Sequence, residues 1–198
     1  MIDDLVKRSL ASVSWNIVVS IIQVLVGFVR SLLLMDLLPP EVFGIYAYSG
    51  SVVTLSGVIP NFGMAGAFLY RSKETEDEDQ TAAIHLTLKL MFTAAWMGIL
   101  TIGAFIFVSE QARLALLVLM VTHGGVMLCQ TPHLILERRV IHRRLALLQS
   151  INIMVSAVTA VLLAWGGIEL WALLSTDIIT LVLTVFFLYI WRPVWRPR

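Results

Sequence analysis

Polar side chains recur at helical spacing inside long apolar segments of this 198-residue chain. Asn16, Gln23 and Arg30 follow one another at intervals of seven residues. Seven residues are close to two helical turns, so these three side chains share one face of a helix. Polar groups are costly in hydrocarbon, and a charged group crosses a membrane only along a polar path. The chemistry that this spacing favours is therefore binding and passage inside a membrane.

Four further apolar segments carry similar polar stripes, and two interpretations of them stay open. Hydroxyl and amide side chains are common where membrane helices pack against one another. The same side chains can instead line a hydrated cavity, and three of these four further segments also contain ionisable groups. The further stripes are His85, Lys89, Thr93 and Trp96; His123 and Gln130; Gln149, Asn152, Ser156 and Thr159; and Asp177, Thr180 and Thr184.

The ionisable side chains inside these segments allow several roles. Arg30 can extend to the outer interface, pair with Asp36 or face a cavity, and Lys89 can extend to the inner interface or face a cavity. Asp177 can neutralise Arg30 or Lys89, or bind a proton or cation that couples to transport. His123 is a second candidate coupling residue, although a lone buried histidine is more often simply hydrogen-bonded.

No catalytic constellation is present, which indicates that the chain is not an enzyme. The sequence lacks a zinc-protease helix, a nucleophile elbow and a glycine-rich phosphate loop followed by lysine. A single cysteine, Cys129, excludes an internal disulfide and a cysteine-based metal site. We expect no cofactor and no metal, and nothing in the sequence suggests nucleic-acid binding.

The stripes must be positioned by membrane helices, because 59% of the residues are hydrophobic and only 14% are charged. A soluble domain carries about a quarter charged residues. A span needs about 20 mostly apolar residues. The sequence predicts an all-α integral membrane bundle of six transmembrane helices in a single lobe, residues 1–198, with spans near residues 13–34, 42–58, 82–108, 113–129, 145–165 and 170–191.

The second predicted span differs from the others because glycine and serine punctuate it and a proline follows it. Pro60 gives a reason for a break near Pro60-Asn61. Small residues allow close helix packing, or they allow a helix to bend during transport. Both interpretations stay open.

The basic residues predict the orientation of this bundle. Positive charge in short loops marks the cytoplasmic side. Of the fourteen Lys and Arg residues, Arg113 alone falls on the outer side and Arg30 and Lys89 lie within spans. The other eleven fall on the inner side if both termini are cytoplasmic: Lys7, Arg8, Arg71, Lys73, Arg138, Arg139, Arg143, Arg144, Arg192, Arg196 and Arg198. We therefore expect a multi-pass protein of the plasma membrane with both termini in the cytoplasm.

Three stretches resemble the polysaccharide (oligosaccharide-lipid) flippase family of the multidrug/oligosaccharidyl-lipid/polysaccharide exporter superfamily. Residues 37–44, LLPPEVFG, are similar to the family's turn after its first helix. Residues 60–67, PNFGMAGA, with Tyr70-Arg71, resemble the stretch that closes its second helix. The loop 138–146 and residues 166–173, GGIELWAL, resemble its later loop and the start of its sixth helix. Asp36, Pro39, His142 and Glu169 depart from the pattern, so no family role is assigned to Asp36.

The resemblance implies one lobe of a two-lobe exporter that moves a polyprenyl-diphosphate-linked oligosaccharide for cell-surface polysaccharide synthesis. The implied partners are this lipid-linked oligosaccharide, membrane lipid, and a second lobe or partner chain. Arg30 and Lys89 would attract the diphosphate, and the polar stripes with Gln23, Asn16 and Asn152 would meet the sugars. The alternatives are a cation-coupled drug exporter lobe of the same superfamily and a truncated, non-transporting membrane subunit.

Overall fold

The computed structural model describes residues 2–61, 63, 65–66, 78–138 and 142–191. Within these residues the fold is all-α, as predicted, and it contains no strand. The elements are α1 (Ile2–Leu37), α2 (Pro40–Ser56), α3 (Val58–Asn61), α5 (Glu78–Phe107), α6 (Glu110–Leu128), α7 (Gln130–Arg138), α8 (His142–Trp165), α9 (Glu169–Val185) and the π-helix η1 (Phe186–Ile190).

Six of these helical segments are long and apolar enough to cross a membrane, which confirms the predicted number of spans. They cover Val19–Leu37, Pro40–Asn61, Gln80–Phe107, Glu110–Leu136, Leu145–Trp165 and Glu169–Ile190. Many large apolar side chains are exposed, including Leu55, Ile99 and Phe107. Because each span presents such side chains on its outer surface, the bundle is a multi-pass membrane protein whose spans face the hydrocarbon of the bilayer.

The fourth span continues beyond its predicted end at Cys129, because α7 extends the apolar segment to Leu136. Two polar residues, Gln130 and Thr131, follow Cys129 in the chain. Thr131 is fully buried, and its hydroxyl lies 2.9 Å from Nδ1 of His85 on α5. The polar side chain is thus satisfied within the bundle, so it does not end the span.

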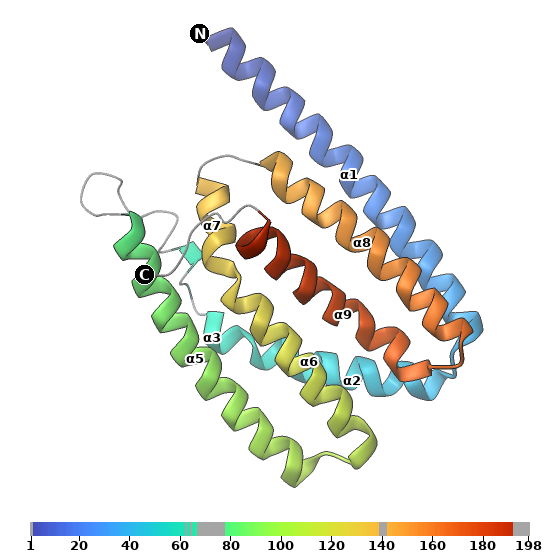
Figure 1. The fold of residues 1–198 in the computed structure, drawn as a ribbon. Coiled ribbons are helices and arrows are strands. Elements are labelled where there is room, and N and C mark those ends of the chain that lie inside the picture. Colours follow the sequence, from blue (N-terminus) through green and yellow to red (C-terminus); the bar gives the residue numbers. More distant parts are fainter. Residues whose placement is uncertain (1, 62, 64, 67–77, 139–141, 192–198) are drawn as a thin grey trace.

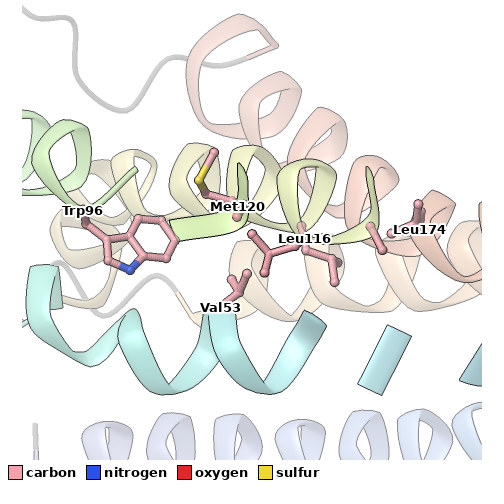
Figure 2. Packing of buried hydrophobic residues seen from close by; sticks show 8 residues of the cluster. Val53, Trp96, Leu116, Met120 and Leu174 are labelled. Atoms are coloured by element: carbon pink, nitrogen blue, oxygen red, sulfur yellow. The ribbon is translucent and has the colours of Figure 1, made fainter. Parts of the chain in front are cut away.

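Helix α6 occupies the centre of the bundle (Figure 1), packing against α5, α2 and α9. Helix α9 also packs on α8, and α8 packs on α1. Figure 2 shows the cluster at the centre, where Val53 of α2, Trp96 of α5 and Leu174 of α9 surround Leu116 and Met120 of α6. This cluster fixes the relative rotation of the helices that carry the candidate site.

Small residues allow α6 to approach its neighbours closely. A Cβ added at Gly124 would lie 3.1 Å from Sδ of Met97, and one at Gly125 would lie 2.6 Å from Cδ1 of Leu181. Neither glycine has a positive φ, so close approach rather than backbone conformation requires them. Glycine at helix contacts is a common device in membrane proteins, where close packing rather than the hydrophobic effect holds helices together.

Three short turns lie at one end of the bundle, after α1, α5 and α8, and the N-terminus lies at the other end (Figure 1). The turn after α8 is a Schellman motif. Gly167 has φ +76°, its N–H bonds to the Ala164 carbonyl, and the Ile168 N–H bonds to the Leu163 carbonyl, both at 3.0 Å. Residue 167 therefore requires the conformational freedom of glycine.

The second span breaks earlier than predicted, at Gly57 rather than near Pro60-Asn61. Pro60 has no N–H and cannot donate to the carbonyl of Ser56. The α-helix therefore ends at Ser56, and the single turn α3 follows Gly57. A Cβ at Gly57 would lie 2.9 Å from Cε of Met127, so α6 packs directly on the break.

Candidate functional site

A carboxyl group lies at the junction of four spans. Asp177, on α9, is partly buried, and its Oδ2 accepts a hydrogen bond of 2.8 Å from the Tyr46 hydroxyl of α2. The Thr176 hydroxyl lies 3.4 Å from the same oxygen. Arg30 of α1 and His123 of α6 both lie within electrostatic range of this carboxyl group. The structure thus brings together three of the predicted site residues, Arg30, Asp177 and His123.

Arg30 is half-buried at this junction, and two groups on other helices interact electrostatically with its charge. Tyr46 and Asp177 both lie within its electrostatic range. Among the described residues, no carboxylate lies close enough to Arg30 for a direct ion pair. The N–H groups of the guanidinium are therefore available to bind an anion. Because the site is half-buried, water would weaken that interaction less than it would at an exposed site.

Helix packing holds the ring of His123 near this cluster. The ring lies 6.3 Å from that of Trp96, centroid to centroid, with the two planes tilted by 56°. Its Nε2 lies next to Gly57, where an added Cβ would come within 3.3 Å. The Trp96 indole N–H donates to the Ser56 hydroxyl at 3.0 Å, which ties α5 to the end of α2. The helix break at Gly57 thus provides the space for the imidazole.

Lys89 lies apart from Arg30, in a different environment. Its side chain is fully buried, with a relative exposure of 0%. Its ammonium group donates to the Pro60 carbonyl at 3.3 Å and to the Asn61 side-chain oxygen. The Asn61 amide in turn donates to the Gly57 carbonyl at 3.0 Å. Lys89 therefore binds the carbonyl end of α3, where a backbone carbonyl and a side-chain oxygen accept from its ammonium group.

The predicted sugar-binding amides lie at helix contacts. Gln23 of α1 donates to Gln149 of α8 across 3.5 Å at an exposed position. Asn152 of α8 exchanges hydrogen bonds of 3.1 and 3.2 Å with Thr180 of α9. Gln149 and Asn152 were predicted on one stripe, but α8 lies between α1 and α9, so they bond to opposite neighbours. Asn16 lies in α1, and its side chain falls outside the described residues.

Two surface grooves accompany this arrangement. One, of about 470 Å³, runs between α1 and α8. Its described lining contains Arg30 beside apolar residues such as Leu33, Val161 and Trp165. The other, of about 500 Å³, lies beside the turn between α5 and α6 and includes Glu41 and Tyr48. Neither groove joins Arg30 to Lys89. The amide side chains of Gln23 and Asn152 thus make contacts between helices, whereas the group around Asp177 remains the candidate site.

Sequence reasoning missed Tyr46 and Thr176, the two hydroxyl groups that contact Asp177. A carboxyl group in mid-span needs donors, and Tyr46 lies on the neighbouring span at a depth where a phenolic hydroxyl otherwise has no partner. The need of the Asp177 carboxyl group for a hydrogen-bond donor could therefore have identified Tyr46 from the sequence. Thr176 gives no such signal, because its hydroxyl also bonds to the Leu173 carbonyl within its own helix, at 2.6 Å.

Comparison with known families gives one match. A family model described as "Polysaccharide biosynthesis protein" matches residues 33–198. No curated protein and no solved structure matches the chain. The matched region contains Asp177, Tyr46, His123 and Lys89, and it begins three residues after Arg30.

Proposed function

Because the chain belongs to the polysaccharide biosynthesis protein family over residues 33–198, we propose that it forms one lobe of a transporter for a lipid-linked oligosaccharide. The substrate is a polyprenyl-diphosphate-linked sugar chain, and the process is translocation across the plasma membrane rather than a chemical reaction. The second half of the pathway comes from another lobe or a partner chain. The single observation that carries the proposal is the grouping of Arg30 and Asp177, with His123 nearby, inside a membrane bundle of this family.

Arg30 provides the recognition element for the diphosphate. A guanidinium presents a planar set of donors that matches phosphate oxygens, and it stays charged at membrane depth. Asp177 supplies the opposite charge that stabilises Arg30 while no substrate is bound. An arriving diphosphate binds the guanidinium donors directly, and its charge competes with the longer-range attraction of Asp177 for Arg30. This competition links substrate binding to the contacts between α1, α2 and α9.

Asp177 and His123 are the proposed coupling residues. The Asp177 carboxyl group is the one acceptor that Tyr46 and Thr176 both contact. Protonation of this group, or binding of a cation to it, would weaken its attraction for Arg30 and favour transfer of Arg30 to the diphosphate. The same carboxyl group is what a cation-coupled drug exporter would need. The guanidinium beside it favours an anionic substrate over a cationic one.

Replacement of Arg30 tests the substrate site. We expect Arg30→Gln to lower surface display of the glycan about tenfold or more, because a charge-assisted hydrogen bond contributes about 1.5–3 kcal/mol and 1.4 kcal/mol is a factor of ten. Arg30→Lys keeps the positive charge and should retain more display than Arg30→Gln. Glycan display is measured on whole cells by antibody or lectin binding, beside the abundance of the protein in isolated membranes. Normal display with Arg30→Gln at normal abundance would remove Arg30 from the site.

The orientation of the bundle is a separate prediction. The distribution of basic residues predicts that both termini are in the cytoplasm and that the turns after α1, α5 and α8 are on the outer side. We expect a fluorescent or phosphatase reporter fused after Arg198 to report a cytoplasmic location, and a reporter inserted at Ser109 to report an outer one. A phosphatase active after Arg198 would contradict this orientation.

A further inference from the structure

A polar groove lies at the end of the bundle that carries the three short turns. It has a volume of about 500 Å³, which is in the range of pockets that hold small ligands. One wall is a single face of α2, and the other is the end of α5 with the start of α6. The residues that line it are Glu41, Gly44, Ile45, Tyr48, Phe107, Val108, Ser109 and Ala112.

The spacing along α2 explains how one helix face supplies a whole wall. Glu41, Gly44, Ile45 and Tyr48 stand at positions i, i+3, i+4 and i+7, which lie above one another on a helix. Gly44 sits between the carboxylate and the phenol ring, and a Cβ added there would meet no atom within 4 Å. The absence of a side chain at this position therefore hollows out the middle of the wall.

The opposite wall is held rigidly by Arg113. Its guanidinium donates to the Val108 carbonyl at 3.1 Å and to the Ala104 carbonyl at 3.3 Å, which satisfies the carbonyl end of α5. The same guanidinium lies 4.9 Å from the centre of the Phe105 ring. The Ser49 hydroxyl donates to the Ala112 carbonyl at 3.3 Å and fixes α2 against α6. The groove is thus pre-formed and needs no rearrangement to accept a ligand.

The lining groups select the chemistry of that ligand. Glu41 offers a carboxylate that accepts hydrogen bonds, and Tyr48 and Ser109 offer hydroxyl groups that donate and accept them. Ser109 precedes α6, yet its hydroxyl makes no capping bond to that helix. The rings of Tyr48 and Phe107 are exposed apolar surfaces whose electron-rich faces suit C–H groups. Among the described residues that line the groove none is basic, which disfavours phosphate and other anions.

We propose that this groove binds an uncharged sugar unit of the transported glycan on the outer side of the membrane. A sugar ring combines hydroxyl groups, which pair with Glu41 and Ser109, with a C–H face, which stacks on Tyr48 or Phe107. The inference rests on the proposed function, and it extends that function by separating two subsites. Arg30 within the first span recognises the diphosphate, whereas the groove recognises an uncharged sugar.

Filling the groove tests the proposal directly. Gly44→Met places a side chain in the groove without a backbone clash, because the space at Gly44 is open. Gly50→Met is the matched control, since Gly50 lies on the same helix, has equally open space and does not line the groove. Both changes replace glycine by a better helix former, so neither should weaken α2. Glu41→Gln, which removes the carboxylate charge and one acceptor, is the second variant.

The probe is a set of oligosaccharides cleaved by mild acid from the host's own surface polysaccharide and freed of lipid and phosphate. Saturation-transfer NMR measures their contact with the full chain in lipid nanodiscs. We expect saturation of sugar protons with the unchanged protein and with Gly50→Met, and at least a fivefold weaker effect with Gly44→Met and Glu41→Gln. Sodium pyrophosphate should not compete, because it would bind at Arg30.

Two outcomes would overturn the inference: no saturation with the unchanged protein, or equal saturation in the Gly44→Met and Gly50→Met variants. In either case the rings of Tyr48 and Phe107 would serve only as interfacial anchors. The assay needs no translocation, so its failure is distinct from that of the proposed function. If Gly44→Met removes sugar binding while Arg30→Gln leaves glycan display normal, the groove stands and the role of Arg30 fails.

Discussion

Lys89→Ala is expected to be among the most destabilising single changes in this bundle. The change removes the donor that satisfies the Pro60 carbonyl and the Asn61 side chain, and it empties a fully buried site. An unsatisfied buried acceptor costs about 1–3 kcal/mol, and the residual cavity adds to that cost. We expect a loss of about 2–4 kcal/mol, measured as a lower midpoint of thermal unfolding in detergent by fluorescence-detected size-exclusion chromatography.

The matched control for this change is Thr87→Ala on the same helix. Thr87 is exposed, and its hydroxyl bonds only to the Ala83 carbonyl of its own helix, at 2.9 Å, so its loss should have little effect. Unfolding of Lys89→Ala at the temperature of the unchanged protein would show that the lysine does not hold α3. The sequence analysis predicted that Lys89 binds substrate. A Lys89→Ala protein that is as stable as the unchanged protein but has impaired glycan display would support that prediction.

Gly124→Leu is the second change with a large expected effect. A side chain at this position would meet Sδ of Met97 at 3.1 Å and Cγ2 of Thr93 at 3.3 Å, both on α5, so the two helices would have to separate. Overpacking of this kind costs about 1–3 kcal/mol. Separation would also move Trp96, which packs beside His123. We therefore expect both a lower unfolding temperature and a loss of glycan display.

Gly98→Leu separates this steric effect from a general effect of adding leucine to the bundle. Gly98 lies on α5 with open space around it, and the new side chain would face outward. It should unfold at or above the temperature of the unchanged protein, since leucine is the better helix former. Equal behaviour of Gly124→Leu and Gly98→Leu would mean that α5 and α6 are not in close contact at Gly124.

The sequence predicted the spans well because hydrocarbon imposes one length on every helix that crosses it. All six predicted spans are present, and the ends at Phe107 and Trp165 agree within one residue with the predicted ends. The extension of the fourth span to Leu136 could not be predicted, because it depends on a contact between Thr131 and His85. Those residues belong to different spans, and only the packed bundle places them together.

The candidate site was predicted less completely than the fold. Arg30 was named as one of two partners for Asp177, and the structure places these two residues in electrostatic range. Lys89, the other partner, binds the end of α3 instead. The choice between them depends on the rotation of each helix about its axis. A stripe predicts which residues share a face, but not which neighbour that face meets.

The short turns after α1, α5 and α8 restrict how the lobe can deform. These connections consist only of residues 38–39, 108–109 and 166–168. Two or three extended residues span only about 7–11 Å. Each of these three pairs of joined helices is thus tethered at the end of the bundle that carries the turns. The two helices of a pair can change their angle about the turn, but neither can slide along the other by more than the length of the connection.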